Sequence, residues 1–150
     1  MAVGGGTVDV GTGTTIVFGT TGYTAELLSI SWSGMARDAI ETTHMATDTT
    51  PGTTEFGSAT FMAVDIADGG TVTAEVHFNP DTTPPLGDTY TAETITITFP
   101  KYGTDATAAN WAFSGFCTTF EVSAPMEDKM TATLTIRVTG GVTITQSVAA

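Results

Sequence analysis

Two histidines, one cysteine and a few neighbouring carboxylates are the residues of this sequence that could support catalysis. Nucleophilic catalysis needs a serine, cysteine or threonine beside a base, but neither His44 nor His77 lies in a recognisable nucleophile motif. Cys117 lies within a predicted strand, where a lone cysteine is usually a small buried apolar residue. The sequence therefore predicts no catalytic residues and no enzyme.

The acidic and glycine-rich clusters are incomplete as ligand sites. Residues 65–69 resemble the start of a calcium loop, but the alternating oxygen ligands and distal glutamate of an EF-hand do not follow. The glycines of Gly4–Gly13 are not followed by the lysine of a phosphate-binding loop. Glu127–Asp128 precedes a predicted strand beside Lys129, as in a solvated turn. We therefore expect no metal site and no cofactor.

The chain is strongly acidic. Sixteen Asp and Glu residues against four Lys and Arg residues give a formal net charge of -12. This charge argues against a surface that grips nucleic-acid phosphates, although acidity alone could simply keep a protein soluble. One cysteine allows no intramolecular disulfide, and no run of eighteen apolar residues occurs. We expect one domain over residues 1–150, without a secretion or membrane signal.

Period-two alternation and 34 threonines predict a mainly β fold. The terminal hairpin is the clearest element: its strands flank the turn at Ser123–Pro125, and Thr131–Val138 alternates polar and apolar residues. Thr71–Phe78 and Glu93–Phe99 are two further strands, whereas Thr14–Thr20 and Glu26–Trp32 should form a first hairpin. The predicted core comprises Leu28, Ile30, Trp32, Val76, Phe78, Ile95, Ile97, Trp111, Phe116, Phe120, Leu134 and Ile136.

Two segments lack this periodicity. Residues 1–13 are glycine-rich and should form a flexible N-terminal arm. Residues 141–150 should form a C-terminal tail, in which Gly141–Thr145 is a further β-like segment. Residues 42–62 should form a long loop, and such loops are usually functional or disordered. Any helix should be short, with Ser58–Asp68 as its best location and a single turn within Tyr102–Asn110. The long segment is either a loop that becomes ordered on assembly or mere slack, and Phe56, Phe61 and Met62 within it favour the former.

Five sequence blocks in this order resemble the tail tube family, or major tail proteins, of long non-contractile-tailed (siphophage-type) bacteriophages. They are ARDAIETTH at Ala36–His44, DIADGGTVTAEVHFNPD at Asp65–Asp81, ETITITFPK at Glu93–Lys101, WAFSGF at Trp111–Phe116 and PMEDKMTATLTIRVTG at Pro125–Gly140. Single blocks such as ETITITF are weak, whereas WAFSGF followed by EDKMTATLTI is fairly specific.

The resemblance implies a β-sandwich or partly closed barrel with one short flanking helix, a long inter-strand loop and an extended N-terminal arm. It also implies that six subunits close into a ring and that rings stack into a hollow tail tube, assembled in the host cytoplasm. In such proteins the long loop and the terminal arms bridge subunits and rings, which implies contacts at Thr42, His44, Met45, Phe56, Phe61 and Met62. Double-stranded DNA would pass through the tube without specific binding. The other implied partners are the tape-measure, tail-tip and tail-terminator proteins. The resemblance implies no membrane partner.

An acidic lumen would keep DNA mobile because like charges repel, and Glu75, Glu93 and Glu121 are the candidate lumen residues. A capsid-decorating or receptor-binding β-domain would share the threonine-rich strands but should lack ring-forming arms. A polysaccharide-acting enzyme would gather aromatic and acidic residues at one cleft. Trp32 and Trp111 lie in apolar alternation, which favours core packing instead.

Overall fold

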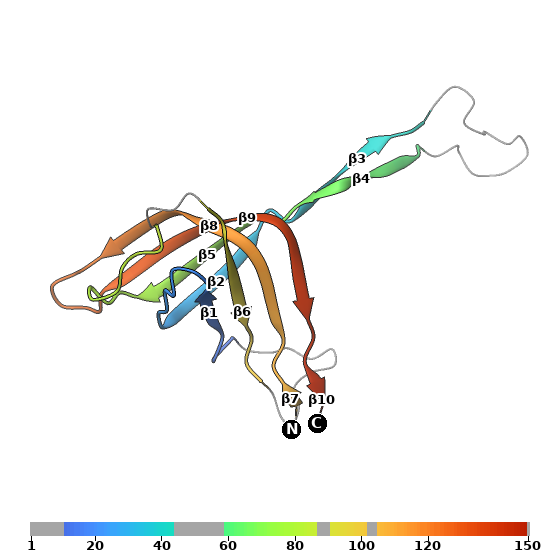
Figure 1. The fold of residues 1–150 in the computed structure, drawn as a ribbon. Helices are drawn as coiled ribbons and strands as arrows, with labels where there is room; N and C mark the ends of the chain where they lie inside the picture. The colour runs from blue at the N-terminus through green and yellow to red at the C-terminus, as the bar shows by residue number, and fades with distance from the viewer. Residues whose placement is uncertain (1–10, 44–58, 87–90, 102–104, 150) are drawn as a thin grey trace, which may run out of the picture.

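The computed structural model describes residues 11–43, 59–86, 91–101 and 105–149, and within them all regular structure is β (Figure 1). The strands are β1 (Thr15–Phe18), β2 (Leu27–Ser33), β3 (Ala36–Glu41), β4 (Phe61–Asp68), β5 (Thr71–His77), β6 (Glu93–Thr98), β7 (Asp105–Thr107), β8 (Asn110–Ser123), β9 (Thr131–Thr145) and β10 (Val148–Ala149). The mainly β prediction is confirmed.

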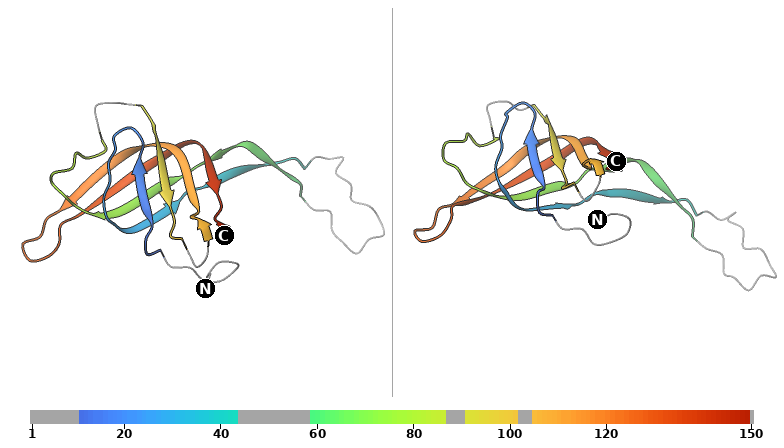
Figure 2. Two further views of the ribbon diagram at one scale, coloured as in Figure 1. Left: turned by 60° about the horizontal axis from the view of Figure 1, so that its bottom comes forward. Right: turned by 90° about the horizontal axis from the view of Figure 1, so that it is seen from below.

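One antiparallel six-stranded sheet, in the order β1-β6-β8-β9-β5-β2, forms the body of the molecule. The sheet curls into a half-barrel (Figure 2), which is the partly closed form of the predicted fold. β8 and β9, with 14 and 15 residues, are the longest strands and form the predicted terminal hairpin. Two small sheets, β3-β4 and β7-β10, extend from this body.

The core lies on the inner face of the curled sheet. Along β9 buried and partly exposed residues alternate from Thr131 to Val138, as the threonine pattern predicts. The predicted core residues Val76, Ile95, Ile97, Leu134 and Ile136 are at most 1% exposed. Ile30, Trp32, Phe78 and Phe120 pack half-buried against this cluster, and the half-buried ring of Trp111 lies 5.3 Å from that of Trp32.

The first predicted hairpin is wrong. β1 pairs with β6 and β2 pairs with β5, so the two strands form opposite edges of the sheet. The connection between them buries Tyr23, whose ring contacts Phe18 at 5.7 Å and Phe120 at 6.1 Å between centroids. The connection between β1 and β2 packs against the core and leads the chain from one edge of the sheet to the other. A tight turn would have placed β2 next to β1.

Two predicted core residues are exposed because β-bulges shift the alternation. Leu28 is 38% exposed, and the register of β2 against β5 shifts between Leu27 and Ser29. Phe116 is 44% exposed, and the register of β8 against β9 shifts between Cys117 and Thr119. An extra residue in one strand reverses the inward and outward alternation beyond it. Residues that an unbroken pattern would place on one face then lie on opposite faces. Phe116 therefore lies outside, whereas Phe120 stays inside.

The predicted helices are also wrong within the described residues. Most of Ser58–Asp68 forms β4, and Asp105–Thr107 forms β7. Ala36–Glu41, for which no regular structure is predicted, forms β3. β3 pairs with β4, and β7 pairs with β10. The β structure of these short strands therefore depends on partners that are distant in sequence.

The β-like segment predicted at Gly141–Thr145 is a strand and forms the end of β9. Residues 142–145 pair with residues 110–113 of β8 after a bulge at Gly140 and Gly141. Gly140 has φ of +76°, a conformation that other residues rarely adopt, and β9 bends in this region (Figure 1). Val148–Ala149 then pairs with β7.

Candidate functional site: the projecting arm and the threonine-rich face

β3 and β4 form a two-stranded arm that projects from one end of the body (Figures 1 and 2). The arm continues the β2-β5 pair, because Ser33 pairs with Thr71 in the body and Ala36 pairs with Asp68 three residues further along each strand. At the far end, the N–H of Thr42 donates to the carbonyl of Thr60 at 2.7 Å. The predicted long loop is therefore partly a β-ribbon.

The arm exposes apolar side chains that nothing in the described part of the chain covers. Ile40 lies directly opposite Met62 in the register, Phe61 lies opposite Glu41, and Ile66 lies further along β4. All four apolar side chains are exposed. An isolated two-stranded hairpin is marginally stable in water, and grouped exposed apolar residues commonly mark an interaction site.

Hydrogen bonds fix the root of the arm to the body. The Arg137 guanidinium of β9 forms an ion pair with Asp68 at 2.6 Å, and the Trp32 indole N–H donates to the Gly69 carbonyl at 2.7 Å. The Gly70 N–H donates to the Asp68 carboxylate at 2.8 Å. This bond and the Arg137 side chain hold the pKa of Asp68 below its ordinary value. The arm is therefore held at its root although its outer part is unsupported.

A polar surface, here called the threonine-rich face, covers the outer side of the three central strands. Its members point away from the core by strand alternation and pair across β5, β9 and β8. They are Thr71, Thr73, Glu75, His77, Phe116, Thr119, Glu121, Ser123, Thr131, Thr133, Thr135 and Arg137. Seven of these twelve residues carry a hydroxyl, and the others are two carboxylates, one guanidinium, one imidazole and the exposed ring of Phe116.

The register brings two of the three candidate lumen carboxylates into one row. Glu75 and Glu121 both pair with Thr133, from opposite sides of β9, and both are exposed. Glu93 lies apart from this row on β6 and is partly buried. Its carboxylate accepts hydrogen bonds from the backbone N–H groups of Thr20 and Thr21, each at 2.8 Å. Glu93 thus fixes the segment after β1.

The other predicted contact residues divide between described and undescribed segments. Phe61 and Met62 lie in β4, and Thr42 follows β3 and is exposed. His44, Met45 and Phe56 lie outside the described residues, as does most of the predicted N-terminal arm. Sequence reasoning missed Ile40, Ile66 and the ion pair at the arm root. The apolar residues within both strands of the arm were the available signal.

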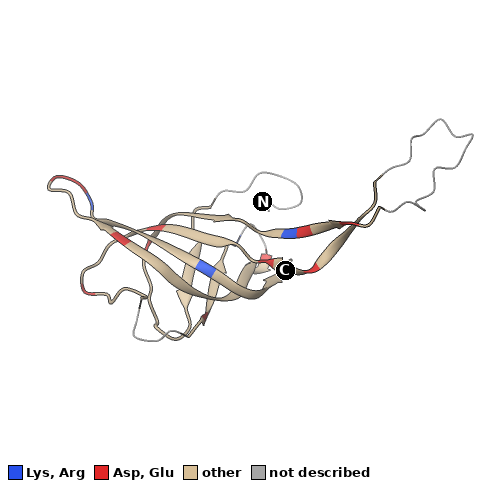
Figure 3. Ribbon diagram, turned by 90° about the horizontal axis from the view of Figure 1, so that it is seen from above, with Lys and Arg blue, Asp and Glu red and all other residues tan. Residues whose placement is uncertain are grey.

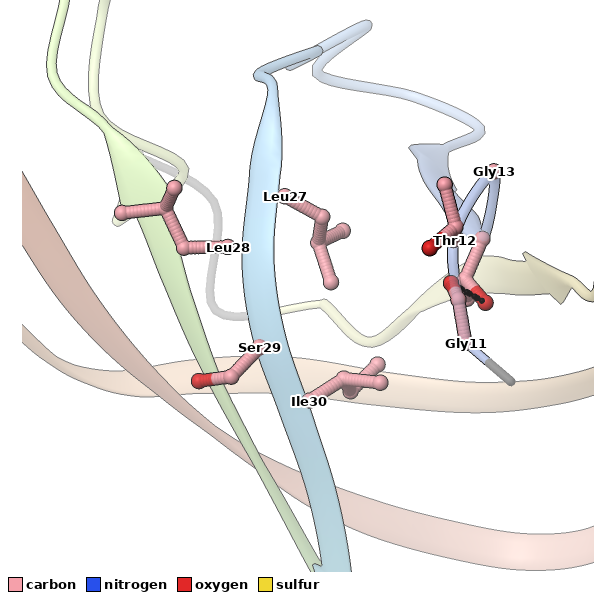
Figure 4. A pocket seen from close by; sticks show the side chains of 8 residues that line it. Gly11, Thr12, Gly13, Leu27, Leu28, Ser29 and Ile30 are labelled. Carbon is pink, nitrogen blue, oxygen red and sulfur yellow. Dashed lines mark hydrogen bonds between the residues drawn. The ribbon is translucent and has the colours of Figure 1, made fainter.

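The described residues form open pockets on the surface of the body. One of about 500 Å³ is lined by Glu26 and His77 together with Thr24, Phe78, Asn79 and Thr82. An open pocket of about 530 Å³ lies between the start of β1 and the β2 edge, where Leu27 and Ile30 point toward Gly11 and Leu28 points away (Figure 4). No charged side chain lines this pocket. In the part of the chain that the structure describes, no His, Cys, Asp and Glu side chains group as metal ligands, and no long apolar helix could cross a membrane.

Cationic side chains are sparse on the ribbon (Figure 3). Of the four basic residues in the sequence, Arg137 is paired with Asp68 at the arm root and Arg37 lies on β3. Lys129 lies in the β8-β9 turn and Lys101 follows β6. Cys117 is buried in β8, and this burial raises the pKa of its thiol, so it is a poor nucleophile.

Comparisons with known proteins find similarity at the level of three-dimensional structure. No protein-family model and no curated protein sequence matches the chain. A chain in the sheath/tube terminator of the PVC extracellular contractile injection system matches with a TM-score of 0.65 and 14% identity, covering 94% of this chain and 99% of that one. The tube-terminating cap of the anti-feeding prophage matches with a TM-score of 0.61 and 15% identity, covering 89% and 87%.

A third similar structure is the tail of an empty GTA particle, refined with C6 symmetry. It matches with a TM-score of 0.59 and 13% identity, covering 92% of this chain and 99% of that one. At such low identities the similarity establishes a shared fold alone. This chain therefore has the fold of tail proteins from phage-like particles.

Proposed function

We propose that this protein is a structural, non-enzymatic subunit of the tail of a phage or phage-like particle. Copies of it would close into six-membered rings, and the rings would stack into a hollow tube. The observation that carries this proposal is the β3-β4 arm, which exposes Ile40, Phe61, Met62 and Ile66 on a ribbon without a partner. Such a ribbon is expected where a neighbouring subunit completes the packing.

Fold similarity supports the proposal from a second direction. The match covers nearly the full length of chains in tail, cap and terminator assemblies, and one of those tails was refined with C6 symmetry. Within this proposal the chain is a siphophage-type major tail protein. The second candidate function is that of a subunit in a ring that ends the tube, because two of the similar structures are terminating assemblies. Both candidates need subunits that interlock.

We further propose that the threonine-rich face lines the lumen. Its hydroxyls have no formal charge, and Glu75 and Glu121 repel phosphate, so DNA would pass without being held. Arg137, the only guanidinium of this face, is paired with Asp68. Double-stranded DNA is then cargo, and the tape-measure, tail-tip and terminator proteins are the other partners. The location is the virion tail, after assembly in the host cytoplasm.

Replacing Glu75 or Glu121 with lysine tests the lumen assignment. Tubes should still assemble because both side chains are exposed, but DNA delivery should fall because lysine binds phosphate. The measurement is infectivity or DNA transfer by particles that carry the variant, with particle number counted by electron microscopy. If variant particles of normal number and appearance deliver DNA as well as native particles do, these residues do not line the lumen.

Removing the arm tests the assembly role. Replacing Ala36–Asp68 with a short glycine-serine turn leaves every strand of the six-stranded sheet in place. Sedimentation velocity should show rings or tubes for the native protein and monomers for the variant. A capsid-decorating or receptor-binding domain, the alternative function, predicts the same monomeric behaviour for both proteins.

A further inference from the structure

An apolar groove of about 390 Å³ lies where the arm meets the body. Met35, Ala36 and Ala67 line it from the arm side, and Gly140, Gly141 and Val142 line it from the bend of β9. The two glycines leave the groove open, because a Cβ added at either would meet no atom within 4 Å. Nothing in the described part of the chain fills this space.

An apolar side chain projects at the other end of the body. The β8-β9 turn carries Met126, which is 94% exposed, the highest value among the large apolar residues found exposed. This turn and the arm extend in opposite directions (Figure 1). From Thr131 to Thr139, β9 connects them over eight residue steps, a span of roughly 27 Å. Met126 therefore cannot reach the groove of its own chain.

One charged group of the groove complements the acidic residues of the turn. Arg37 lines the groove, and its guanidinium donates to the Val64 carbonyl at 3.1 Å without an ion-pair partner among the described residues. Asp68, the acidic group beside the groove, is already paired with Arg137. Next to Met126, Glu127 and Asp128 outnumber the one basic residue, Lys129. The groove thus offers one guanidinium without an ion-pair partner among the described residues, on an arm that also carries Asp38 and Asp65, and the turn offers two carboxylates beside Met126.

We propose that the β8-β9 turn of one copy docks at the arm root of the next copy, with Met126 in the groove and an acidic neighbour against Arg37. Methionine suits such a site because its flexible side chain fills irregular space. The contact joins different surfaces of two copies, so it is head-to-tail and can close into a ring or continue as a filament. The inference rests on the proposed function in requiring that copies of this chain assemble.

Disulfide trapping between two separately purified variants tests the contact. Met126→Cys and Ala67→Cys are mixed, oxidised and examined by non-reducing gel electrophoresis, with the buried Cys117 as a shared background. A heterodimer should form in the mixture and exceed any dimer of either variant alone. Val17→Cys, also exposed but on the β1 edge, replaces Ala67→Cys as the matched control.

Filling the groove gives a second readout that does not need a new cysteine. Gly141→Leu should raise the concentration needed for assembly at least tenfold while leaving the unfolding temperature of the monomer unchanged, because the added side chain enters open space. Gly141→Ala, the matched control, leaves most of the groove free and should assemble nearly as the native protein does.

The outcomes separate this contact from the proposed function. A specific heterodimer supports the contact whether or not tubes form. If the native protein forms rings or tubes but no heterodimer appears and Gly141→Leu assembles normally, the contact is overturned while the tube function stands. If neither assembly nor crosslinking occurs at any concentration, both are overturned.

Discussion

The double substitution Ile40→Ser and Phe61→Ser should separate assembly from folding. Both residues lie on the arm and are 50% and 63% exposed, so neither contributes much to the core of the monomer. Exposed substitutions usually change the free energy of unfolding by less than about 0.5 kcal/mol. Assembly should be weakened much more, because these side chains are proposed to lie in the interface between subunits.

The magnitude follows from the surface that remains to be buried. Burying a large apolar side chain completely contributes about 1.5–3 kcal/mol, and half to two thirds of each side chain is still exposed. Covering the remainder of both should therefore contribute roughly 2–3 kcal/mol per interface. Losing that amount weakens each contact by roughly 30- to 150-fold.

The assay is sedimentation velocity over a range of protein concentrations, paired with thermal unfolding of the monomer. The double variant should need a correspondingly higher concentration to form rings or tubes, with an unchanged unfolding temperature. Leu86→Ser is the matched control, since Leu86 is 48% exposed but lies outside the arm. Assembly of the double variant at the native concentration would refute the role of the arm.

Three further predictions concern the body and the arm root. Leu134→Ala should lower the free energy of unfolding by about 2–5 kcal/mol, as expected of a fully buried leucine, and denaturant titration should show a smaller loss for Phe116→Ala on the outer face. Gly70→Ala should cost more than about 1 kcal/mol in the same titration, because Gly70 has φ of +80° and a Cβ would collide with the Ser33 carbonyl. Because the folded pKa of Asp68 lies below its ordinary value of 3.8, its contribution to stability should be complete above that pH and lost as pH falls through the lowered pKa. Asp68→Asn should remove this part of the acid dependence, and an acid titration equal to that of the native protein would contradict the assignment.

The strongly periodic strands of the body could be predicted from the sequence because each carries its burial pattern locally. β5, β6 and the β8-β9 hairpin all lie where alternation indicates them. Pairing was harder, because β1 and β2 are neighbours in sequence yet form opposite edges. The errors at Leu28 and Phe116 have one cause, since a bulge reverses the alternation without leaving a signal in residue types.

The arm shows why the candidate site was only partly predictable. Residues 36–41 and 61–68 lack a clean period of two because neither side of the ribbon is buried within the subunit. The pattern that identifies a strand comes from a hydrophobic core, and the arm has none. Glu75 and Glu121 could each be identified from the sequence as candidate lumen residues. That both lie beside Thr133 in one row follows only from the register of the strands.

Negative-stain electron microscopy of the purified protein at high concentration tests the central claim most directly. The native protein should form hollow rings or tubes whose end views show six-fold symmetry, and the arm-deleted variant should form none. Dispersed monomers for the native protein, persisting after tail-tip components are added, would contradict the assignment of this chain to a tail tube.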